Sequence, residues 1–365
     1  MRILVLANFG LGLYKFRKEL LEKLVKNGDE VFVSFPKDDY AQKVKDLGCH
    51  FIETNYDRKG KNPFDDLKLM AEYRRLLKEI KPGVVLTYTI KPTVYGGMAC
   101  QLERIPYIVN ITGPSVAAEK GGLISKIVFM LYRLGLRKAS KVFFQNKTNQ
   151  DIMVNMGLIH CPYEIIPGSG VNLEQYEVYD YPKDDKVEFA FIGRITETKG
   201  IRYYLEAAKM IKEKYPQTVM HVCGGFDEDD YKQMVFDYDK EGIVAYHGLV
   251  DNMKEFYQKI HCTVLPTFYA EGMSNVLLES LASGRPIITT DRPGCGEIVD
   301  DGINGFVVKQ QDAEDLYEKM RKFILLDYET KKQMGLNGRK KVEMGFDRNI
   351  VIRKYLEEVD RFRNI

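Results

Sequence analysis

The chain of 365 residues has 45% hydrophobic and 29% charged residues, as in an ordinary globular enzyme, and its length predicts about two domains. No segment resembles a secretion signal or reaches the ~18 apolar residues of a spanning helix, and six scattered cysteines without a C-x-x-C pair argue against a disulfide framework or zinc site. The net charge of +2, without a recognised nucleic-acid motif, disfavours a nucleic-acid partner, and we expect a cytoplasmic protein.

Strand and helix patterns alternate through the first half of the chain. Helical periodicity is clearest at 63–80 and 122–138. Alternation of this kind predicts a parallel sheet with crossover helices, the α/β class. The apolar runs typical of buried strands lie at 2–7, 31–34, 51–54, 84–87, 107–111, 141–144 and 163–166.

The alternation breaks at residues 167–172 (PGSGVN) and a polar stretch to about Asp185, which we interpret as an interdomain linker. We therefore predict two doubly wound, Rossmann-like domains at 1–172 and 186–346, facing a cleft. A last helix at roughly 347–364 belongs to neither pattern. Strands of the second domain are expected at 188–192, 218–223, 243–247, 262–266, 287–290 and 305–308, and helices at 200–214, 228–240, 251–260, 272–283 and from 312 onward.

The first loop that could carry chemistry follows the first strand and contains Gly10 and Gly12. Glycines let backbone N–H groups approach an anion, and the helix that follows adds its dipole. The third glycine of a dinucleotide fingerprint is absent. The loop therefore predicts either a contact to a phosphate or sugar, or an ordinary strand-to-helix turn.

A second loop, FIGRITETKG at 191–200, places Gly193, Arg194 and Lys199 between a strand and a helix. Two cations at the carboxyl end of a strand can clamp a diphosphate and neutralise it as it leaves. The alternative is a surface arginine and lysine beside a helix start.

A third segment, EGMSNVLLE, separates Glu271 from Glu279 by a turn and an apolar stripe. A helix that begins just after Glu271 would expose backbone N–H groups and its positive dipole end, which suits a phosphate. Eight residues rise about 12 Å, so both carboxylates could face one elongated ligand. The segment predicts a nucleotide-sugar site, although two Glu at this spacing also occur on ordinary helices.

These segments together resemble a family 4 glycosyltransferase of the GT-B type. The resemblance rests on Arg194 with Lys199, the Glu271–Glu279 pair, ASGRPIITT (282–290) and GCGEIVDDGINGFVV (294–308). In the first half, LYKFRKELL (13–21), YTIKPTVYGG (88–97), VNITG (109–113) and IPGSGVN (166–172) are similar to the branch that assembles capsular, exopolysaccharide or O-antigen units. The resemblance implies transfer with retention of anomeric configuration and a C-terminal helix, 347–365, that returns to the N-terminal domain.

The resemblance also implies roles for individual residues. Arg194 and Lys199 would bind the donor diphosphate beside Gly193, Glu279 the ribose hydroxyls, and Glu271 the sugar ring. Gly12 would approach the diphosphate from the other domain. The backbone N–H groups expected to face the sugar and phosphates are those of Gly272, Met273, Ser274 and Asn275.

One departure concerns the N-terminal catalytic loop, where many relatives carry a histidine. The matching segment at 110–122 contains none, and Pro114-Ser115 replaces an expected glycine. We therefore expect no histidine in acid–base catalysis, and prefer front-face attack, with the departing phosphate taking the acceptor proton, over double displacement through Glu271. Catalysis is assigned to Glu271, Arg194 and Lys199. No metal and no cofactor are expected, since the acidic run Asp227–Asp230 is interpreted as surface charge.

The acceptor is expected to be a saccharide, free or linked to polyprenyl diphosphate. Residues 1–170 carry 26 Lys and Arg against 17 Asp and Glu, which indicates an anionic partner unless the excess is a solvated surface. Lys15, Arg17 and Lys91 are candidate acceptor-binding residues. Segment 121–141 combines an apolar run with basic residues, so it predicts either a peripheral contact with the inner membrane surface or a core helix with a basic end.

Two other functions fit the same patterns. A UDP-sugar 2-epimerase has the same fold and also uses a nucleotide sugar, and a two-domain sugar-binding protein would close on its ligand without chemistry. Arg194 and Lys199 are superfluous for binding a neutral sugar, so a transferase that uses a nucleotide-sugar donor, in the first instance a UDP-sugar, is the preferred prediction.

Overall fold

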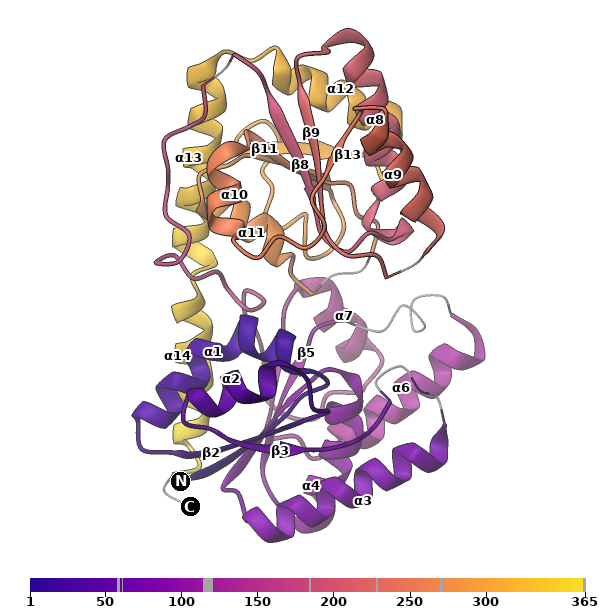
Figure 1. The fold of residues 1–365 in the computed structure, drawn as a ribbon. Coiled ribbons are helices and arrows are strands. Elements are labelled where there is room, and N and C mark those ends of the chain that lie inside the picture. Colours follow the sequence, from indigo (N-terminus) through magenta and orange to yellow (C-terminus); the bar gives the residue numbers. More distant parts are fainter. Residues whose placement is uncertain are drawn as a thin grey trace. The chain divides into compact units, whose positions relative to one another are not determined.

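The structure is a computed structural model that describes residues 1–57, 60, 62–113, 121–183, 185–227, 229–269 and 272–363 (Figure 1). The chain divides into two compact units. Unit 1 comprises Met1–Ser169 with Asn349–Ile365, and unit 2 comprises Gly170–Arg348. Each unit contains one parallel sheet flanked by helices, so the predicted α/β class is confirmed.

Unit 1 is built on a seven-stranded sheet in the order β3-β2-β1-β4-β5-β6-β7. All neighbouring strands in the described part of this sheet are parallel, so each connection must cross over one face. The strands are β1 (Arg2–Leu6), β2 (Glu30–Phe35), β3 (His50–Glu53), β4 (Val84–Tyr88), β5 (Tyr107–Ile111), β6 (Lys141–Phe144) and β7 (Tyr163–Ile165).

Alternating strand residues supply two separate hydrophobic cores. In β1, Ile3 and Val5 belong to the core under α1, α2 and α14, whereas Leu4 and Leu6 belong to the core under α3, α4 and α6. Burial on both faces explains why these strands read as continuous apolar runs. The helices of unit 1 are α1 (Gly10–Lys26), α2 (Tyr40–Asp46), α3 (Pro63–Ile80), η1 (Pro92–Gly96), α4 (Gly97–Glu103), α6 (Gly122–Leu136), α7 (Lys147–Asn155) and α14 (Arg348–Asp360).

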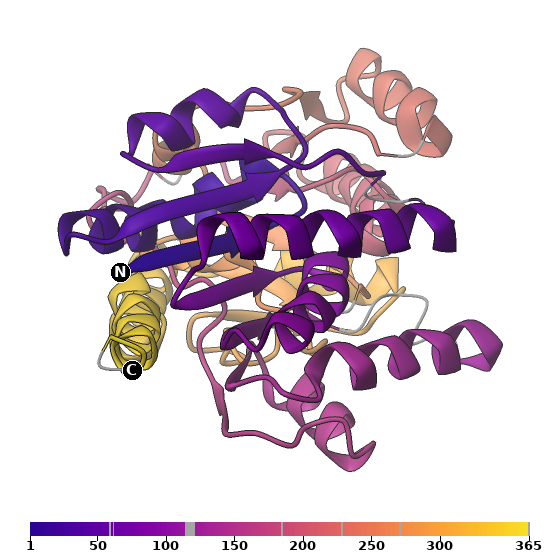
Figure 2. The ribbon, with the colours of Figure 1, turned by 90° about the horizontal axis from the view of Figure 1, so that it is seen from below.

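The C-terminal helix α14 completes unit 1. Its buried Val351, Tyr355 and Val359 join the core of α1, and the Asn110 amide donates a hydrogen bond to the Tyr355 hydroxyl at 2.7 Å. The same helix is seen end-on in Figure 2, close to the N-terminus. Segments from the two ends of the sequence therefore share one core.

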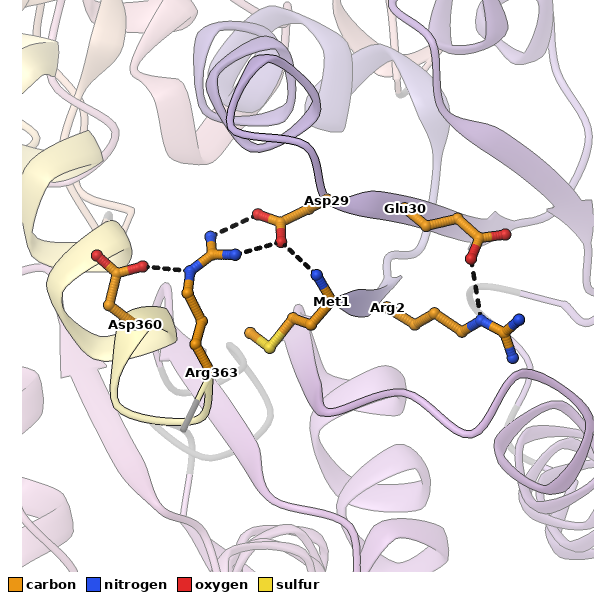
Figure 3. A network of polar contacts seen from close by, with 6 residues as sticks. All are labelled: Met1, Arg2, Asp29, Glu30, Asp360 and Arg363. Atoms are coloured by element: carbon orange, nitrogen blue, oxygen red, sulfur yellow. Dashed lines mark hydrogen bonds and ion pairs between the residues drawn. The ribbon is translucent and has the colours of Figure 1, made fainter. Parts of the chain in front are cut away.

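An ion network joins the segment after α14 to Asp29, which lies between α1 and β2 (Figure 3). Arg363 donates to both carboxylate oxygens of Asp29, at 2.5 and 2.6 Å, and the amine of Met1 lies 2.9 Å from the same side chain. The Asp29 side chain is fully buried. Burial acts to raise the pKa of Asp29, but the bonds from Arg363 and Met1 outweigh it and leave that pKa lowered.

Unit 2 contains a six-stranded parallel sheet in the order β10-β9-β8-β11-β12-β13. Helices α8 and α12 lie side by side, and so do α11 and α13 (Figure 1). Its strands are β8 (Glu188–Ile192), β9 (Val219–Cys223), β10 (Ala245–Tyr246), β11 (Cys262–Leu265), β12 (Ile287–Thr290) and β13 (Gly305–Val308). Its helices are η2 (Glu197–Lys199), α8 (Ile201–Lys214), η3 (Asp229–Tyr231), α9 (Lys232–Lys240), α10 (Met253–Lys259), α11 (Asn275–Ala282), α12 (Ala313–Ile324) and α13 (Tyr328–Gly345).

Most predicted elements are found, with differences at their ends. The helix expected at 272–283 begins only at Asn275, because Ser274 is extended and its N–H donates to Gly294 O instead of starting a helix. The strand expected at 243–247 is reduced to Ala245–Tyr246, which lies at the edge of the sheet. The polar stretch after Gly170 belongs to unit 2 rather than standing apart as a linker.

Candidate functional site

Two loops interlock at the carboxyl ends of β8 and β11. The Thr198 carbonyl accepts hydrogen bonds from the Thr267 hydroxyl and from the N–H groups of Phe268 and Tyr269, at 3.0 to 3.1 Å. Gly200 has φ +81°, and a β carbon there would lie 2.2 Å from the Pro266 oxygen. The 193–200 loop is thereby held against the loop that leads towards α11.

The 193–200 loop begins where the backbone of Gly193 lies close to that of Cys223 and Gly224. Gly193 donates from its N–H to Cys223 O at 2.9 Å. A β carbon on Gly224 would lie 1.7 Å from Gly193 O, so no larger residue fits at position 224 without a backbone shift. The position of the Gly193 peptide is thus fixed by the end of β9.

Arg194 and Lys199 lie beside the same aromatic ring. The Arg194 guanidinium carbon is 5.9 Å from the centre of the Tyr269 ring, and the Lys199 ammonium is 5.4 Å from it. Both distances fall within the range of cation–π attraction. The structure therefore brings together two cations that are five residues apart in the sequence, and Tyr269 is the side chain they share.

The two cations differ in their surroundings. Arg194 is 54% exposed and donates to a carboxylate oxygen of Asp227 at 2.7 Å. Lys199 is half-buried, and burial lowers its pKa to about 8, with the nearby Arg194 charge acting in the same direction. An anion bound here would favour the charged form of Lys199.

The start of α11 adds backbone donors. Its first intrahelical bond runs from Leu278 N to Ser274 O at 3.2 Å. The amides that precede Leu278 in the first turn therefore have no acceptor within the helix. The Ser274 N–H itself donates to Gly294 O at 2.9 Å and is committed to that loop. The Asn275 side-chain oxygen is buried and has no hydrogen-bond partner among the described residues. Met273 and Gly272 are buried in the same turn.

Cys295 connects the α11 start to the lysine. The Lys199 charge lowers the pKa of Cys295, although burial dominates and raises it to about 11. Cys295 follows Gly294, the residue bonded to Ser274. Lys199 therefore lies near the same short loop that bonds the α11 start, and Glu297 accepts a bond from Gly294 N in that loop at 2.7 Å.

Glu279 lies one helical turn further along α11, between two tyrosines. Burial, followed by the negative charge of Glu279, raises the pKa of Tyr176, and the same two causes lead for Tyr257. Both phenols therefore keep their protons at neutral pH; the Tyr176 hydroxyl is a donor towards the carboxylate, whereas the Tyr257 hydroxyl donates to Val276 O at 3.1 Å. The Glu279 carboxylate therefore lies close to both phenol rings, with Tyr176 as its hydrogen-bond donor.

Part of the predicted site lies outside the described residues. Glu271 is one such residue, so its predicted role at the sugar ring stays a prediction. The same holds for residues 114–120, which belong to the 110–122 segment that the resemblance identifies with the N-terminal catalytic loop.

The glycine loop of unit 1 has mainly local contacts in the structure. Gly10 N, at the start of α1, donates to a carboxylate oxygen of Asp38 at 2.7 Å. A β carbon on Gly12 would lie 2.5 Å from the Phe9 ring, so this glycine gives room to that side chain. These contacts explain the two glycines without a ligand, and the predicted approach of Gly12 to a diphosphate stays a prediction.

The three acceptor-binding candidates of unit 1 lie in different environments. Lys15 is exposed on α1. Arg17 is 5% exposed, with its guanidinium carbon 5.0 Å from the Tyr88 ring centre and 5.7 Å from that of Tyr355. The Lys91 ammonium lies 2.8 Å from an Asp66 oxygen, in a largely buried ion pair. An acceptor anion would have to compete with Asp66 for Lys91.

The described residues contain no cluster of three or more His, Cys, Asp or Glu side chains arranged to hold a metal ion. Within the described part of unit 2, Arg194 and Lys199 bring positive charge towards the α11 start, and Arg292 lies in the loop bonded to that start and acts on the same Cys295 as Lys199. Arg194, Lys199 and the backbone donors of the α11 first turn make a candidate site for an anionic group, with the Glu279 carboxylate one turn further along the helix.

Two family models match the chain, one in each half. Residues 179–341 match the group 1 glycosyl transferases, and residues 2–146 match the glycosyl transferase 4-like proteins. Together the matches span most of the sequence, including the segments that carry Arg194, Lys199 and Glu279. The chain belongs to the glycosyltransferases that these two models describe, group 1 and 4-like.

Curated relatives of the glycosyltransferase match over most of their length. It is 29% identical, over an alignment of 379 residues and 99% of each chain, to the N,N'-diacetylbacillosaminyl-diphospho-undecaprenol alpha-1,3-N-acetylgalactosaminyltransferase of Campylobacter jejuni. It is 25% identical over 307 residues, 79% of each chain, to CapM of Staphylococcus aureus, a capsular polysaccharide biosynthesis glycosyltransferase. The predicted resemblance to polysaccharide-assembling glycosyltransferases is confirmed.

Solved structures show that the glycosyltransferase has the predicted GT-B fold. HepE of Anabaena superimposes with a TM-score of 0.82 at 17% identity, over 99% of both chains. Sucrose-phosphate synthase of Thermosynechococcus elongatus superimposes with a TM-score of 0.79 at 19% identity, over 99% of this chain and 98% of that one.

Several site residues of the glycosyltransferase carried no sequence signal. Tyr269 and Asp227 follow different strands from the one before Arg194, and only strand order places them beside it. Tyr176 lies about 100 residues before Glu279, in a stretch interpreted as linker. Asp227 lies on the surface, as the interpretation of the acidic run as surface charge expects, and its bond to Arg194 is a further contact that the sequence did not predict. Arg285 of the ASGRPIITT motif is fully buried and donates to backbone carbonyls, including Tyr257 O at 2.7 Å, so its role is structural.

Proposed function

We propose that this glycosyltransferase transfers a sugar from a UDP-sugar, with retention of anomeric configuration, to a saccharide carried on a polyprenyl diphosphate. The observation that carries the proposal is the placement of Arg194 and Lys199 beside one Tyr269 ring and near the α11 start. The product would be an intermediate of a bacterial surface polysaccharide or glycan.

The cation pair supports a diphosphate leaving group. Negative charge develops on the diphosphate as the bond to the sugar breaks, and fixed cations stabilise that charge more in the transition state than in the bound donor. Lys199 is suited to this role because its partly buried ammonium has a lowered pKa and gains from an adjacent anion. The backbone amides of the α11 first turn would add donors to the same group.

Glu279 supports a nucleoside at the other end of the donor. Its carboxylate lies beside the Tyr176 and Tyr257 phenols, accepts a hydrogen bond from Tyr176, and is half-buried. A carboxylate held in this way can accept hydrogen bonds from two neighbouring ribose hydroxyls. Glu271, eight residues earlier, is proposed to hold hydroxyls of the transferred sugar.

The relatives support the acceptor class. The Campylobacter enzyme is named for an acceptor linked through diphosphate to undecaprenol and for an alpha linkage, and its match covers 99% of each chain. A retaining enzyme forms an alpha product from an alpha-linked UDP-sugar, which agrees with front-face attack. UDP-N-acetylgalactosamine is therefore the first donor to test, with no added metal.

The experiment combines purified protein, UDP-N-acetylhexosamines and UDP-hexoses, and polyprenyl-diphosphate-linked saccharides, followed by product analysis by mass spectrometry and NMR. We expect one donor to give an alpha-linked product, equally in the presence of a chelator. Incubation with donor alone should leave the nucleotide sugar unchanged. Epimerised donor in that incubation would instead favour a UDP-sugar 2-epimerase.

Variants separate the proposed roles. Lys199→Ala should lower kcat by about 100-fold or more, as the loss of a charge-stabilising donor does in other enzymes. Glu271→Gln should lower turnover too. Near wild-type turnover of Lys199→Ala would remove the leaving-group argument, and near wild-type turnover of Glu271→Gln would remove its role at the sugar. Lys309→Ala, an exposed lysine elsewhere in unit 2, is the matched control.

A further inference from the structure

Helix α6 of unit 1 exposes five large apolar side chains. Leu123, Ile124, Ile127, Met130 and Leu134 are 74, 56, 45, 54 and 42% exposed. Contiguous apolar surface of this kind is uncommon on a soluble monomer and marks a site of interaction with a protein or a membrane. No ligand-binding role in the donor site accounts for it.

The exposed apolar side chains form one stripe. Positions 123, 127, 130 and 134 follow the i, i+4, i+7, i+11 spacing, which places them within about 60° of one another around the helix. The opposite face is buried, with Tyr132 and Leu136 in the core of unit 1. Large apolar side chains therefore lie on both faces of α6, but the rest of unit 1 covers only one of these faces.

The orientation of this stripe is fixed by packing. A β carbon on Gly135 would lie 2.6 Å from the Val94 Cα, so α6 lies directly on η1. The Gln101 side chain donates to Leu134 O at 2.7 Å, and Arg133 donates to Met156 O at 3.3 Å. Turning the helix inward would break these contacts, so the apolar stripe stays outward.

Positive charge borders the stripe. Lys126, Arg133, Arg137 and Lys138 are all exposed, and the sequence contains no Asp or Glu from Gly121 to Gln150. Around the helix Lys126, Arg133 and Arg137 lie along one edge of the stripe and Lys138 along the other. An apolar stripe edged with lysine and arginine complements an anionic lipid surface, where apolar groups enter the acyl boundary and cations meet headgroups.

We propose that this face of α6, defined by Leu123, Ile124, Ile127, Met130 and Leu134 with their basic neighbours, docks unit 1 on an anionic lipid bilayer. The helix would lie along the interface. No helix in the described ranges is long and apolar enough to cross a bilayer. A symmetric dimer through this face would bring like charges of two copies together, which disfavours self-association. That docking brings the enzyme to a lipid-linked acceptor rests on the proposed function. The docking itself rests only on the apolar and basic side chains of α6.

The first experiment measures binding of the purified full chain to vesicles without any donor or acceptor. We expect flotation with phosphatidylglycerol–phosphatidylcholine vesicles and little with phosphatidylcholine alone. Leu123→Gln/Ile127→Gln/Met130→Gln should abolish flotation. Lys126→Glu/Arg137→Glu/Lys138→Glu should lower the partition coefficient by about 100-fold, since each basic residue near an anionic surface contributes several-fold.

The matched charge control is Lys240→Glu/Lys309→Glu/Lys340→Glu, which changes the net charge equally through exposed lysines of unit 2. It should float like wild type. Equal loss in both triple variants would show net-charge attraction without a docking face and overturn the proposal. Circular dichroism and thermal melting of each variant exclude misfolding as the cause.

A fluorescence experiment localises the contact, because the chain contains no tryptophan. Met130→Trp should show a blue-shifted emission on adding anionic vesicles, whereas Leu325→Trp, at an exposed apolar position in unit 2, should not shift. No shift at position 130 overturns the proposal, as does concentration-dependent dimerisation that the α6 glutamine variant removes. Failure of the proposed transfer reaction would leave both readouts unchanged, so the two proposals can fail separately.

Discussion

Arg194 donates a hydrogen bond to Asp227 at 2.7 Å, so the arginine proposed to hold the donor diphosphate is already paired with a carboxylate. The pair is half exposed, with side-chain exposures of 54 and 40%. Such a pair is weak enough for a phosphate to displace. Asp227 thus places a negative charge next to the proposed diphosphate site.

The first prediction concerns this carboxylate. Asp227→Asn should tighten UDP binding by roughly threefold to tenfold, because one exposed like charge near a bound anion costs about 1 kcal/mol. Isothermal titration at low and high salt measures it, and the gain should shrink at high salt. Asp229→Asn, an exposed neighbour in η3, is the control. Weaker binding by Asp227→Asn would mean that Asp227 orients Arg194 instead.

The second prediction concerns the pH dependence of donor binding. The pKa of Lys199 is lowered to about 8, so the unliganded protein loses this cation as the pH rises above that value. The dissociation constant for UDP should therefore increase between pH 8 and pH 10. Lys199→Arg should flatten the profile, because an arginine stays charged. A wild-type profile as flat as that of Lys199→Arg would contradict the prediction.

The same lowered pKa affects stability with a definite sign. Between the folded pKa of about 8 and the unfolded pKa near 10.4, the unfolded chain binds more protons at Lys199 than the folded chain does. This residue alone therefore makes the folded state more stable as the pH rises through that range. Lys199→Met should remove that contribution, which comparison of urea unfolding at pH 7.5 and 10 would detect.

The third prediction concerns the orientation of Glu279. Tyr176→Phe removes one donor to the carboxylate, and the donor KM should rise about tenfold or more, as expected for one hydrogen bond to a charged group. Glu279→Gln should abolish most of the preference for UDP over 2′-deoxy-UDP. Tyr328→Phe, whose hydroxyl bonds to Tyr181 O, is the control. A full ribose preference in Glu279→Gln would contradict its role.

The fourth prediction concerns the C-terminal segment. Arg363→Gln breaks the bonds to buried Asp29 and should lower the free energy of unfolding at pH 7 by about 2 kcal/mol. The pKa of Asp29 is lowered in the folded state, so this contribution is present above pH ~4 and is lost as the pH falls through the folded pKa. Wild type and variant should therefore converge in acid.

Urea unfolding from pH 3 to pH 7 measures this effect. Arg361→Gln, which removes an exposed arginine paired with Glu358, should cost less than about 0.5 kcal/mol at every pH. A cost for Arg363→Gln that does not change with pH would show that packing of the arginine stem, and not the Asp29 ion pair, stabilises the segment.

Much of the fold could be predicted from the sequence because parallel strands buried on both faces leave a clear local pattern. Segments such as 84–87 and 141–144 read as continuous apolar runs, and the structure has β4 and β6 there. Helix boundaries were harder, because they depend on what caps them. Ser274 is extended and bonded to Gly294, a partner 20 residues away that no local pattern reveals.

The two cations proposed for the donor site could be singled out from the sequence, whereas their neighbours could not. Arg194 and Lys199 share one loop after a strand, a position that indicates ligand binding in any open α/β sheet. Tyr269, Asp227 and Tyr176 reach the site from other strands and loops, and each looks ordinary in its own segment. The exposure of the α6 stripe was likewise undecided, because periodicity does not show which of two apolar faces is covered.

The sequence by itself determined the strand–helix alternation, the two halves and the charged and glycine loops, because these depend on local periodicity and residue type. The tertiary structure decided which side chains meet. It placed one tyrosine ring beside two cations, paired Asp29 with Arg363 across 334 residues, and left one face of α6 exposed. Strand order and helix packing create these contacts, and local sequence periodicity does not reveal either of them.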